Sequence, residues 1–220
     1  NITDRPQWYV VPGGSRSYVE RLVTKVQDNI RLNADIKSIS RSEDEVTLTF
    51  NDGHSETFDE VVLACHSDQA LTLLQDPTEK EQQVLEALPY SPNEVVLHLD
   101  TKMLPKKKLS WASWNYRLSG DNDKPAAVTY NMNILMGLNS HHTFCVSLNQ
   151  TKSIDKSKIL ASFNYHHPVI NPDSYKAQKR RDEICGHNRT HFAGAYWYQG
   201  FHEDGVKSAL DVAARFGETL

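Results

Sequence analysis

The clearest candidate for a binding site lies near the end of the chain. A short apolar run, residues 191–193, is followed by Gly194, by Gly200 and by a helix start that carries Glu203 and Asp204. Residues 209–216 then have the apolar periodicity of a helix. A buried strand that turns through glycine into a helix points backbone N–H groups at one place, where phosphate or carbonyl oxygens can bind. The pattern predicts a cofactor cradle. Glycines and acids are also common at helix starts without any ligand, so the local pattern alone leaves both interpretations open.

The composition is that of an ordinary globular protein. The 220 residues are 39% hydrophobic and 24% charged, with a formal net charge of -4, which indicates a sizeable core and no bias toward nucleic acid or an anionic membrane. No apolar run reaches the roughly 18 residues that a membrane-spanning helix needs. Cys65, Cys145 and Cys185 are odd in number and widely spaced. We therefore expect reduced cysteines in a cytoplasmic protein rather than a disulfide framework.

The first third of the chain predicts a helix, an antiparallel meander and a buried strand. Residues 16–27 predict a helix, with a capping box at residues 17–20. Residues 36–58 predict a three-stranded antiparallel meander whose hairpin closes at residues 51–53. Residues 61–64 form a continuous apolar run, which is typical of a strand buried on both faces of a larger sheet.

The middle of the chain has a different character. Residues 67–88 predict two helical segments separated near Pro77. Residues 155–164 are compatible with a helix or a strand, residues 175–184 predict a charged helix, and the lysine run 106–108 is expected in a solvated loop rather than in a nucleic-acid patch. Strand-like runs bounded by turn residues predict one antiparallel or mixed sheet, at residues 95–99, 111–116, 127–132 and 143–148.

Other residues with chemical potential favour simpler interpretations. Ten histidines are present, but no His-x-x-x-His or Cys-x-x-Cys spacing accompanies them, so we expect surface or turn positions and no metal site. Trp111 and Trp114 are expected to pack in a core or a sheet, with the lining of a substrate cavity as the alternative. Tyr196, Trp197 and Tyr198 adjoin the glycine turn, and one of them is a candidate to face a bound ring.

The order of these pieces is more specific than any one of them. Residues 8–22, the meander, the strand ending at residues 61–65 and the terminal segments 192–194 and 200–205 together resemble flavin-containing amine oxidases and their phytoene-desaturase-like relatives. More narrowly, they resemble a bacterial group of predicted NAD/FAD-binding proteins. The family's dinucleotide fingerprint, Gly-x-Gly-x-x-Gly, is absent here and lies upstream in the family. The resemblance therefore implies that this sequence is a fragment of a longer enzyme.

The resemblance also implies a fold and a cofactor. The expected fold class is α/β, and α+β in the inserted part: a partial FAD/NAD(P)-binding domain of residues 1–66 and 190–220, with a mixed-sheet substrate domain of residues 67–189 between. FAD is the implied cofactor. The positions that match the family's FAD contacts are Ile36, Ala64, Cys65, Gly194, Tyr196, Gly200, Phe201, His202, Glu203 and Val206. The candidates for substrate contact are Trp111, Trp114 and Tyr198.

The sequence departs from the family at three of these places. Cys65-His66 stands where a small residue and a proline are usual, and Ala195-Tyr196 stands where an acid commonly follows the glycine. Many amine oxidases carry a lysine near flavin N5, and the corresponding strand here reads Asn93-Glu94-Val95. The missing lysine argues against a typical amine oxidase and leaves a dehydrogenase, desaturase or isomerase of an apolar substrate open.

The resemblance implies an FAD-dependent oxidoreductase in which flavin N5 takes a hydride from an amine or an apolar small-molecule substrate. The alternative is a non-catalytic binding or structural fragment without bound flavin, and a third possibility uses FAD only as a scaffold. We expect no nucleic-acid partner. Sheet edges left unpaired in a fragment predict a homodimer or aggregation.

Overall fold

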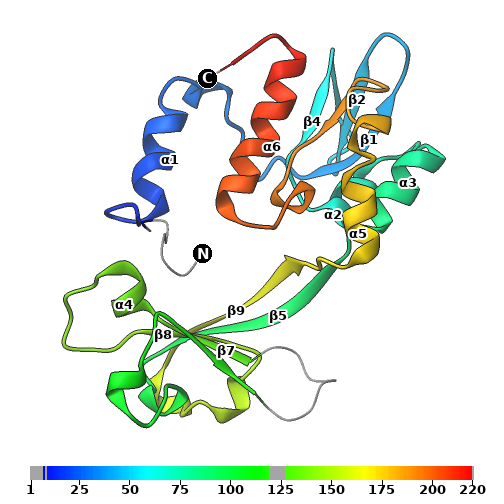
Figure 1. Ribbon diagram of the computed structural model, residues 1–220. Helices are drawn as coiled ribbons and strands as arrows, with labels where there is room; N and C mark the ends of the chain where they lie inside the picture. The colour runs from blue at the N-terminus through cyan, green and yellow to red at the C-terminus, as the bar shows by residue number, and fades with distance from the viewer. Residues whose placement is uncertain (1–6, 8, 119–126, 220) are drawn as a thin grey trace.

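The computed structural model describes residues 7, 9–118 and 127–219 and has two lobes joined by one long pair of strands (Figure 1). The first lobe is built from both ends of the chain and the segments next to them. The second lobe is one antiparallel sheet with short helical turns along it. This arrangement confirms the predicted mixture of helices and sheets.

The first lobe contains two small sheets and five helices among the described residues. Its strands are β1 (Ile36–Arg41), β2 (Val46–Phe50), β3 (Ser55–Phe58), β4 (Val61–Leu63) and β10 (Thr190–Phe192). Its α-helices are α1 (Ser15–Val23), α2 (Ser67–Leu73), α3 (Glu79–Glu86), α5 (Pro172–Gln178) and α6 (His202–Arg215). Its 3-10 turns are η1 (Gln27–Asn29), η6 (Arg181–Glu183) and η7 (Ala195–Trp197).

The meander β1–β2–β3 is antiparallel, as predicted. Its hairpin closes where the Gly53 N–H donates to the Phe50 carbonyl at 3.0 Å, with Gly53 at a φ of 91° that favours glycine. The predicted capping box of α1 is wrong. The helix begins at Ser15 after Gly14, so Ser17 lies inside the first turn, and its hydroxyl donates back to the Gly14 carbonyl at 2.9 Å.

Strands β4 and β10 pair in parallel, with Val62 opposite His191 and Leu63 opposite Phe192. In the described part of the chain these two strands form a sheet of their own. The expectation that β4 is buried on both faces of a larger sheet is therefore wrong here. Leu63 is buried, but Val62 keeps 46% of its surface exposed. The apolar run predicted burial on both faces within a larger sheet, and β4 pairs only with β10 among the described strands.

The second lobe holds a five-stranded sheet in the order β6–β7–β8–β5–β9, antiparallel throughout. Its strands are β5 (Tyr90–His98), β6 (Trp114–Arg117), β7 (Ala127–Asn131), β8 (Cys145–Leu148) and β9 (Ile159–Pro168). The connecting elements are η2 (Thr101–Met103), η3 (Lys108–Ser110), α4 (Met132–Met136), η4 (Thr151–Ser153) and η5 (Lys156–Lys158). The predicted sheet is confirmed, and the segment left open between helix and strand is strand β9.

Strand β5 starts at Tyr90. The sequence predicted a later start, at Val95, because Pro92 interrupts the strand pattern. Pro92 is tolerated there since β8 pairs with β5 only from Val95 onward, so the side of Pro92 away from β9 needs no donor. Strands β5 and β9 together form the ribbon that connects the lobes (Figure 1).

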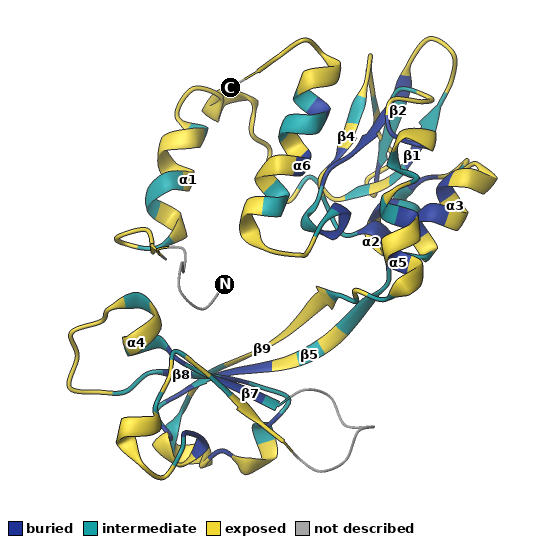
Figure 2. Cartoon of the chain, in the orientation of Figure 1, coloured by how far each residue is buried: buried dark blue, intermediate teal, exposed yellow. Residues whose placement is uncertain are grey.

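Each lobe has its own hydrophobic cluster (Figure 2). The larger cluster lies in the first lobe and takes residues from β1, β4 and β10. Helices α2, α3 and α5, which lie within residues 67–189, also contribute to it through Ala70, Val84 and Ala177. The smaller cluster, Val96, Met103 and Ile154, lies under the sheet of the second lobe. The three cysteines are free.

No described helix is both long and apolar enough to cross a membrane.

Candidate functional site

The parallel pairing of β4 and β10 brings together two segments that are far apart in the sequence. The Ala193 N–H donates to the Leu63 carbonyl at 3.0 Å, so the chain leaves both strands side by side. Ala64 and Cys65 follow β4, and Gly194 follows β10. Ligands of parallel sheets bind beyond the carboxyl ends of the strands. Three of the predicted cofactor-binding residues thus share the end of the sheet where a ligand is expected.

Gly194 is required by its neighbour Tyr196. A Cβ at position 194 would lie 2.3 Å from Cε1 of the Tyr196 ring, so the ring occupies the space of a side chain. The Gly194 N–H donates to the Ser208 hydroxyl at 2.8 Å, which ties the turn to α6. This N–H is therefore already paired within the protein.

At the start of α6, too, backbone N–H groups are already paired within the protein. The Phe201 N–H donates to the Asp204 carboxylate at 2.9 Å, and the Gln199 N–H donates to the same oxygen at 3.1 Å. The N–H groups of His202 and Glu203 lie in the first turn, where the helix supplies no acceptor, and neither is paired with another described residue. The negative charge of Glu203 and Asp204 favours the positive end of the helix dipole.

Two further contacts position this helix start. Gly200 has a φ of +85°, and a Cβ there would lie 3.3 Å from Pro168 at the end of β9. Glycine thus lets the turn pass close to the ribbon between the lobes. His202 Nε2 lies 2.5 Å from the Tyr18 hydroxyl, which links α6 to α1. Phe201 and Val206 are largely exposed on the same helix.

Aromatic residues gather beside the ends of β4 and β10. The His66 ring stacks on Tyr90 with centroids 4.0 Å apart, and Tyr90 meets Tyr196 edge to face at 6.4 Å. Burial, with the nearby Asp68, raises the pKa of Tyr90 to about 12, so its hydroxyl stays protonated near neutral pH. Sequence reasoning missed Tyr90 because it expected the strand to begin later. The stacking partner His66 directly follows Cys65, which is the signal that pointed to this place.

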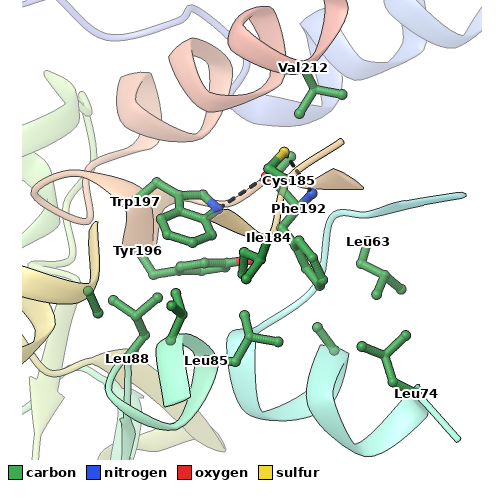
Figure 3. Close-up of a cluster of buried hydrophobic side chains, with 14 of the residues drawn as sticks. Leu63, Leu74, Leu85, Leu88, Ile184, Cys185, Phe192, Tyr196, Trp197 and Val212 are labelled. Carbon is green, nitrogen blue, oxygen red and sulfur yellow. Dashed lines mark hydrogen bonds between the residues drawn. The ribbon is translucent and has the colours of Figure 1, made fainter. Parts of the chain in front are cut away.

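Tyr196 lies inside the core rather than on its surface (Figure 3). Its ring packs beside Trp197, whose Nε1 donates to the Phe192 carbonyl at 3.1 Å. Burial raises the pKa of Tyr196 far above its ordinary value. Among the described residues its hydroxyl has no hydrogen-bond partner, so one buried polar atom at this end of the sheet is still unsatisfied.

Ile36 is the first residue of β1, opposite Phe50, and its side chain packs partly buried against the large core. The predicted contact of Ile36 with the adenine uses its backbone and remains a prediction.

The three predicted substrate contacts lie in two lobes. Trp114 is on β6 and is 57% exposed. Trp111 precedes that strand, and its Nε1 donates to the Pro105 carbonyl at 2.8 Å, so it closes a turn. Tyr198 is in the first lobe, where its hydroxyl donates to the Asp211 carboxylate at 2.5 Å. Burial and this carboxylate raise the pKa of Tyr198.

The strand register places Trp114 in a continuous apolar surface. One row across the sheet joins Trp114, Tyr130, Val146, Leu97 and Ala161. The next row on the same face joins Tyr116, Val128, Leu148, Val95 and Phe163. We call this surface the aromatic face. At its margins Trp114, Tyr116 and Phe163 remain about half exposed, and Phe163 stacks on Tyr165 at 5.5 Å.

The opposite face of the same sheet is polar and buried. His98 Nε2 lies 2.8 Å from the Ser147 hydroxyl, which lies 2.7 Å from the Thr129 hydroxyl. The His98 Nδ1 accepts the Asp100 N–H at 3.0 Å, which leaves the ring proton on Nε2 as the donor to Ser147. Two histidines, His98 and His191, are thus buried, against the expectation of surface or turn positions. The described residues contain no group of three or more side chains arranged to hold a metal ion.

Comparison of the sequence with protein families gives one match, to the profile of flavin containing amine oxidoreductases, over residues 2–141. That match covers more than half of the chain. The chain belongs to the flavin-containing amine oxidoreductase family. This confirms the resemblance inferred from the order of the motifs. No curated protein is similar enough in sequence to count as a match.

Solved structures of a fatty acid isomerase and of two oxidases share the fold. A CLA-producing fatty acid isomerase from P. acnes superposes with a TM-score of 0.66 at 17% identity, covering 92% of this chain and 52% of that one. Putrescine oxidase bound to putrescine gives 0.63 at 11% identity, with 93% and 53% covered. Cyclohexylamine oxidase from Brevibacterium oxydans IH-35A gives 0.59 at 12% identity, with 93% and 53% covered. The chain therefore spans about half the length of these structures.

FAD is the cofactor that membership of this family indicates. The residues present fit such a group at the end of the β4–β10 pair. Ala64 and Cys65 lie there beside Gly194, and the Tyr196 ring that packs on Gly194 carries a buried hydroxyl with no partner among the described residues. Of the backbone donors expected to face the cofactor, those of Gly194 and Phe201 are taken by Ser208 and Asp204, which leaves those of His202 and Glu203.

Proposed function

We propose that the chain is part of an FAD-dependent oxidoreductase that oxidises an apolar small-molecule substrate. The single observation that carries the choice of substrate is the aromatic face of the five-stranded sheet. Two full rows of aligned side chains on that face contain no charged residue. An apolar molecule laid on this surface removes apolar area from water on both partners, which stabilises binding by about 25 cal/mol per Å².

Bound FAD supplies a ring whose N5 accepts a hydride from a carbon of the substrate. The residues of this chain bind the cofactor and orient the substrate. Ala64, Cys65 and Gly194 admit the cofactor beyond the strand ends, with the N–H groups of the first turn of α6 as donors to its oxygens. The positive end of the α6 dipole favours negative charge at that place. The aromatic face orients the substrate and excludes water from one side of it.

A small polar amine is a poorer fit than an apolar substrate. An ammonium group needs a carboxylate or carbonyl to replace its water, and neither row of the aromatic face offers a carboxylate. Among the structures that share the fold, the fatty acid isomerase acts on an apolar substrate, whereas putrescine oxidase was solved with a diamine bound. We therefore favour a long apolar chain as the substrate class.

The second candidate function is a non-catalytic binding or structural unit. It is favoured by the Gly194 and Phe201 N–H groups, which are already paired inside the protein. We also propose a division into a partial FAD-binding domain, residues 1–66 and 190–220, and a substrate domain, residues 67–189, whose helices α2, α3 and α5 pack on the core of the first lobe. The free cysteines support a cytoplasmic location.

Titration with FAD tests the cofactor part of the proposal. Flavin fluorescence and the visible spectrum are followed for this chain and, in parallel, for any longer product of the same gene. We expect a structured flavin spectrum in at least one of the two. Absence of binding by both would contradict the proposed use of FAD.

Binding of oleic acid tests the substrate part. The double variant Trp114→Ala with Phe163→Ala removes two half-exposed rings from the aromatic face and is expected to weaken oleic acid binding about tenfold or more, because each ring contributes apolar contact area. Phe58→Ala, which removes an exposed ring from β3 in the other lobe, is the matched control and is expected to change nothing. Equal effects of both variants, or stronger flavin reduction by putrescine than by oleic acid, would overturn the apolar assignment.

A further inference from the structure

Charge is unevenly divided between the lobes. The segment 90–170, whose described residues form the second lobe, contains nine lysines and arginines against five aspartates and glutamates in the sequence. The whole chain carries a formal net charge of -4, so the first lobe is strongly acidic and the second is basic. A net charge for the complete chain conceals this separation.

The basic residues of the second lobe gather on its short helical turns. The turns lie along the green and yellow-green edge of the second lobe, on the side away from the first lobe (Figure 1). We call this edge the lysine edge. Its members are Lys102, Lys106, Lys107, Lys108, Lys152, Lys156 and Lys158. Lys102 and Lys106 line one hollow of about 280 Å³ together with Arg117.

The acidic residues of this edge are few and engaged. Asp100 is buried and accepts the N–H groups of Lys102 and Asp155, while Lys158 Nζ lies 3.6 Å from its carboxylate. Asp155 is exposed, and its carboxylate accepts the N–H and hydroxyl of Ser157. The outer surface of the turns therefore keeps most of its positive charge.

An apolar side chain projects from the turn that carries the lysine run. Leu109, the residue after the lysine run, is fully exposed. The turn that carries it is fixed rather than loose, because the Trp111 Nε1 donates to the Pro105 carbonyl and the Lys108 ammonium lies 5.9 Å from the Trp111 ring centre. The exposed Leu109 side chain therefore has a fixed position among the lysines.

We propose that the lysine edge docks the protein on an anionic membrane surface. Lysines attract the phosphate headgroups, and Leu109 enters the boundary between headgroups and acyl chains. Charge complementarity selects the partner: seven lysines and one leucine suit a lipid surface. Nucleic-acid sites instead favour arginine forks and several exposed rings for base stacking. Among the described residues the hollow of the lysine edge offers one arginine, Arg117, and one half-exposed ring, Tyr116.

The docking surface is independent of the proposed oxidoreductase activity. The turns of the lysine edge pack under the polar face of the sheet, through Met103 and Ile154 against Val96. The aromatic face is on the other side of the same sheet. Docking through the lysine edge therefore leaves the aromatic face free except at Tyr116, which also lines the hollow with Lys102 and Lys106.

Flotation with vesicles tests the proposal on the chain itself. Vesicles of phosphatidylcholine alone are compared with vesicles that also contain phosphatidylglycerol, at low and high salt. We expect partition onto the anionic vesicles only, weakened by salt because exposed charges are screened. The variant Lys106→Gln, Lys107→Gln, Lys108→Gln is expected to lower partition about 100-fold, from about fivefold for each lysine near the surface. Leu109→Ser is expected to lower it about tenfold with all charges kept.

The matched control is Lys25→Gln, Lys37→Gln, Lys80→Gln, which removes three exposed lysines from the first lobe. It loses the same net charge and is expected to leave partition unchanged. Equal loss in both triple variants would reduce the effect to net charge and overturn the proposal. So would the absence of binding to anionic vesicles at low salt. Tighter binding to a duplex oligonucleotide than to the vesicles would assign the lysine edge to nucleic acid instead.

Discussion

At the scale of single residues, the glycine turn after β10 serves packing before it serves any ligand. Gly194 yields its side-chain space to the Tyr196 ring and its N–H to Ser208. Its residue type is thus explained by contacts inside the protein. Glycine at this position is explained by its packing against Tyr196 whether or not a cofactor also approaches it.

Gly194→Ala is therefore expected to destabilise the protein even when no flavin is bound. The new Cβ would meet the Tyr196 ring at 2.3 Å, and an overpacked core costs about 1–3 kcal/mol in the free energy of unfolding. Gly205→Ala is the control, because a Cβ at this helical position meets no atom within 4 Å and alanine favours a helix. Urea unfolding measures both. Equal stability of the two variants would show that Tyr196 does not need the glycine.

A second expectation at this scale concerns Arg41. Its guanidinium lies 2.6 Å from Glu81, and both side chains are almost fully buried. Arg41→Met leaves the Glu81 carboxylate buried without its cation, which is expected to cost about 3–5 kcal/mol in urea unfolding. The double variant with Glu81→Gln removes both charges and is expected to recover part of the loss. Arg31→Met breaks a solvent-exposed pair with Glu56 and serves as the control, with no measurable change expected.

At the scale of elements, a buried polar network holds the sheet of the second lobe. It joins β5, β8 and β7 through His98, Ser147 and Thr129. Burial lowers the pKa of His98 below its ordinary 6.5, opposed by the charge of Asp100. The neutral ring fits the network, since Nδ1 accepts and Nε2 donates. Because the covering turns supply only a small apolar cluster, this lobe depends on satisfied hydrogen bonds more than the first lobe does.

The network predicts a pH dependence with a definite sign. The unfolded chain binds a proton on His98 below about pH 6.5, and the folded protein does so only at lower pH. The contribution of His98 to stability is therefore constant above about pH 6.5 and falls as the pH drops below it, by up to about 1.4 kcal/mol per pH unit. Urea midpoints at pH 7.5 and about pH 5.5 measure the fall. His98→Asn is expected to reduce it, leaving the part from His191, whose pKa burial also lowers. An unchanged fall in His98→Asn, or a reduced one in the exposed control His141→Asn, would contradict this.

At the scale of the whole molecule, the short parallel sheet has an edge that the described part of the chain leaves unpaired. Strand β4 pairs with β10 on one side only, and Val62 is exposed on it. Unpaired edges with apolar side chains attract other strands. The first lobe therefore combines a large core with an incomplete sheet.

We expect this edge to make the chain self-associate. Size-exclusion chromatography with light scattering should show dimers or larger species. Val62→Lys is expected to shift them toward monomer, because a charged side chain blocks strand addition. Val26→Lys places the same charge at an exposed valine outside the sheets and should not. A monodisperse monomer of the unaltered chain would contradict the expectation.

The sequence by itself determined the elements whose causes are local. The meander, the hairpin at Gly53, the helices on both sides of Pro77 and the strand–glycine–helix order at the end of the chain all follow from periodicity and turn residues. The order of these motifs also sufficed to indicate the family. The start of β5 was missed because the strand pairs with β9 from Tyr90 onward, through Pro92. The cap of α1 was missed because the helix begins at Ser15, two residues before the expected capping residue Ser17.

Tertiary structure alone decided what depends on distant partners. It set Ala64 and Cys65 beside Gly194, stacked His66 on Tyr90, and showed that Ser208 and Asp204 occupy donors that a local pattern leaves free. It also aligned the aromatic face and gathered the lysines on one edge, although the net charge of the chain is negative. Strand register and the separation of the lobes arise from contacts between residues far apart in the sequence, so periodicity along the chain carries no record of them.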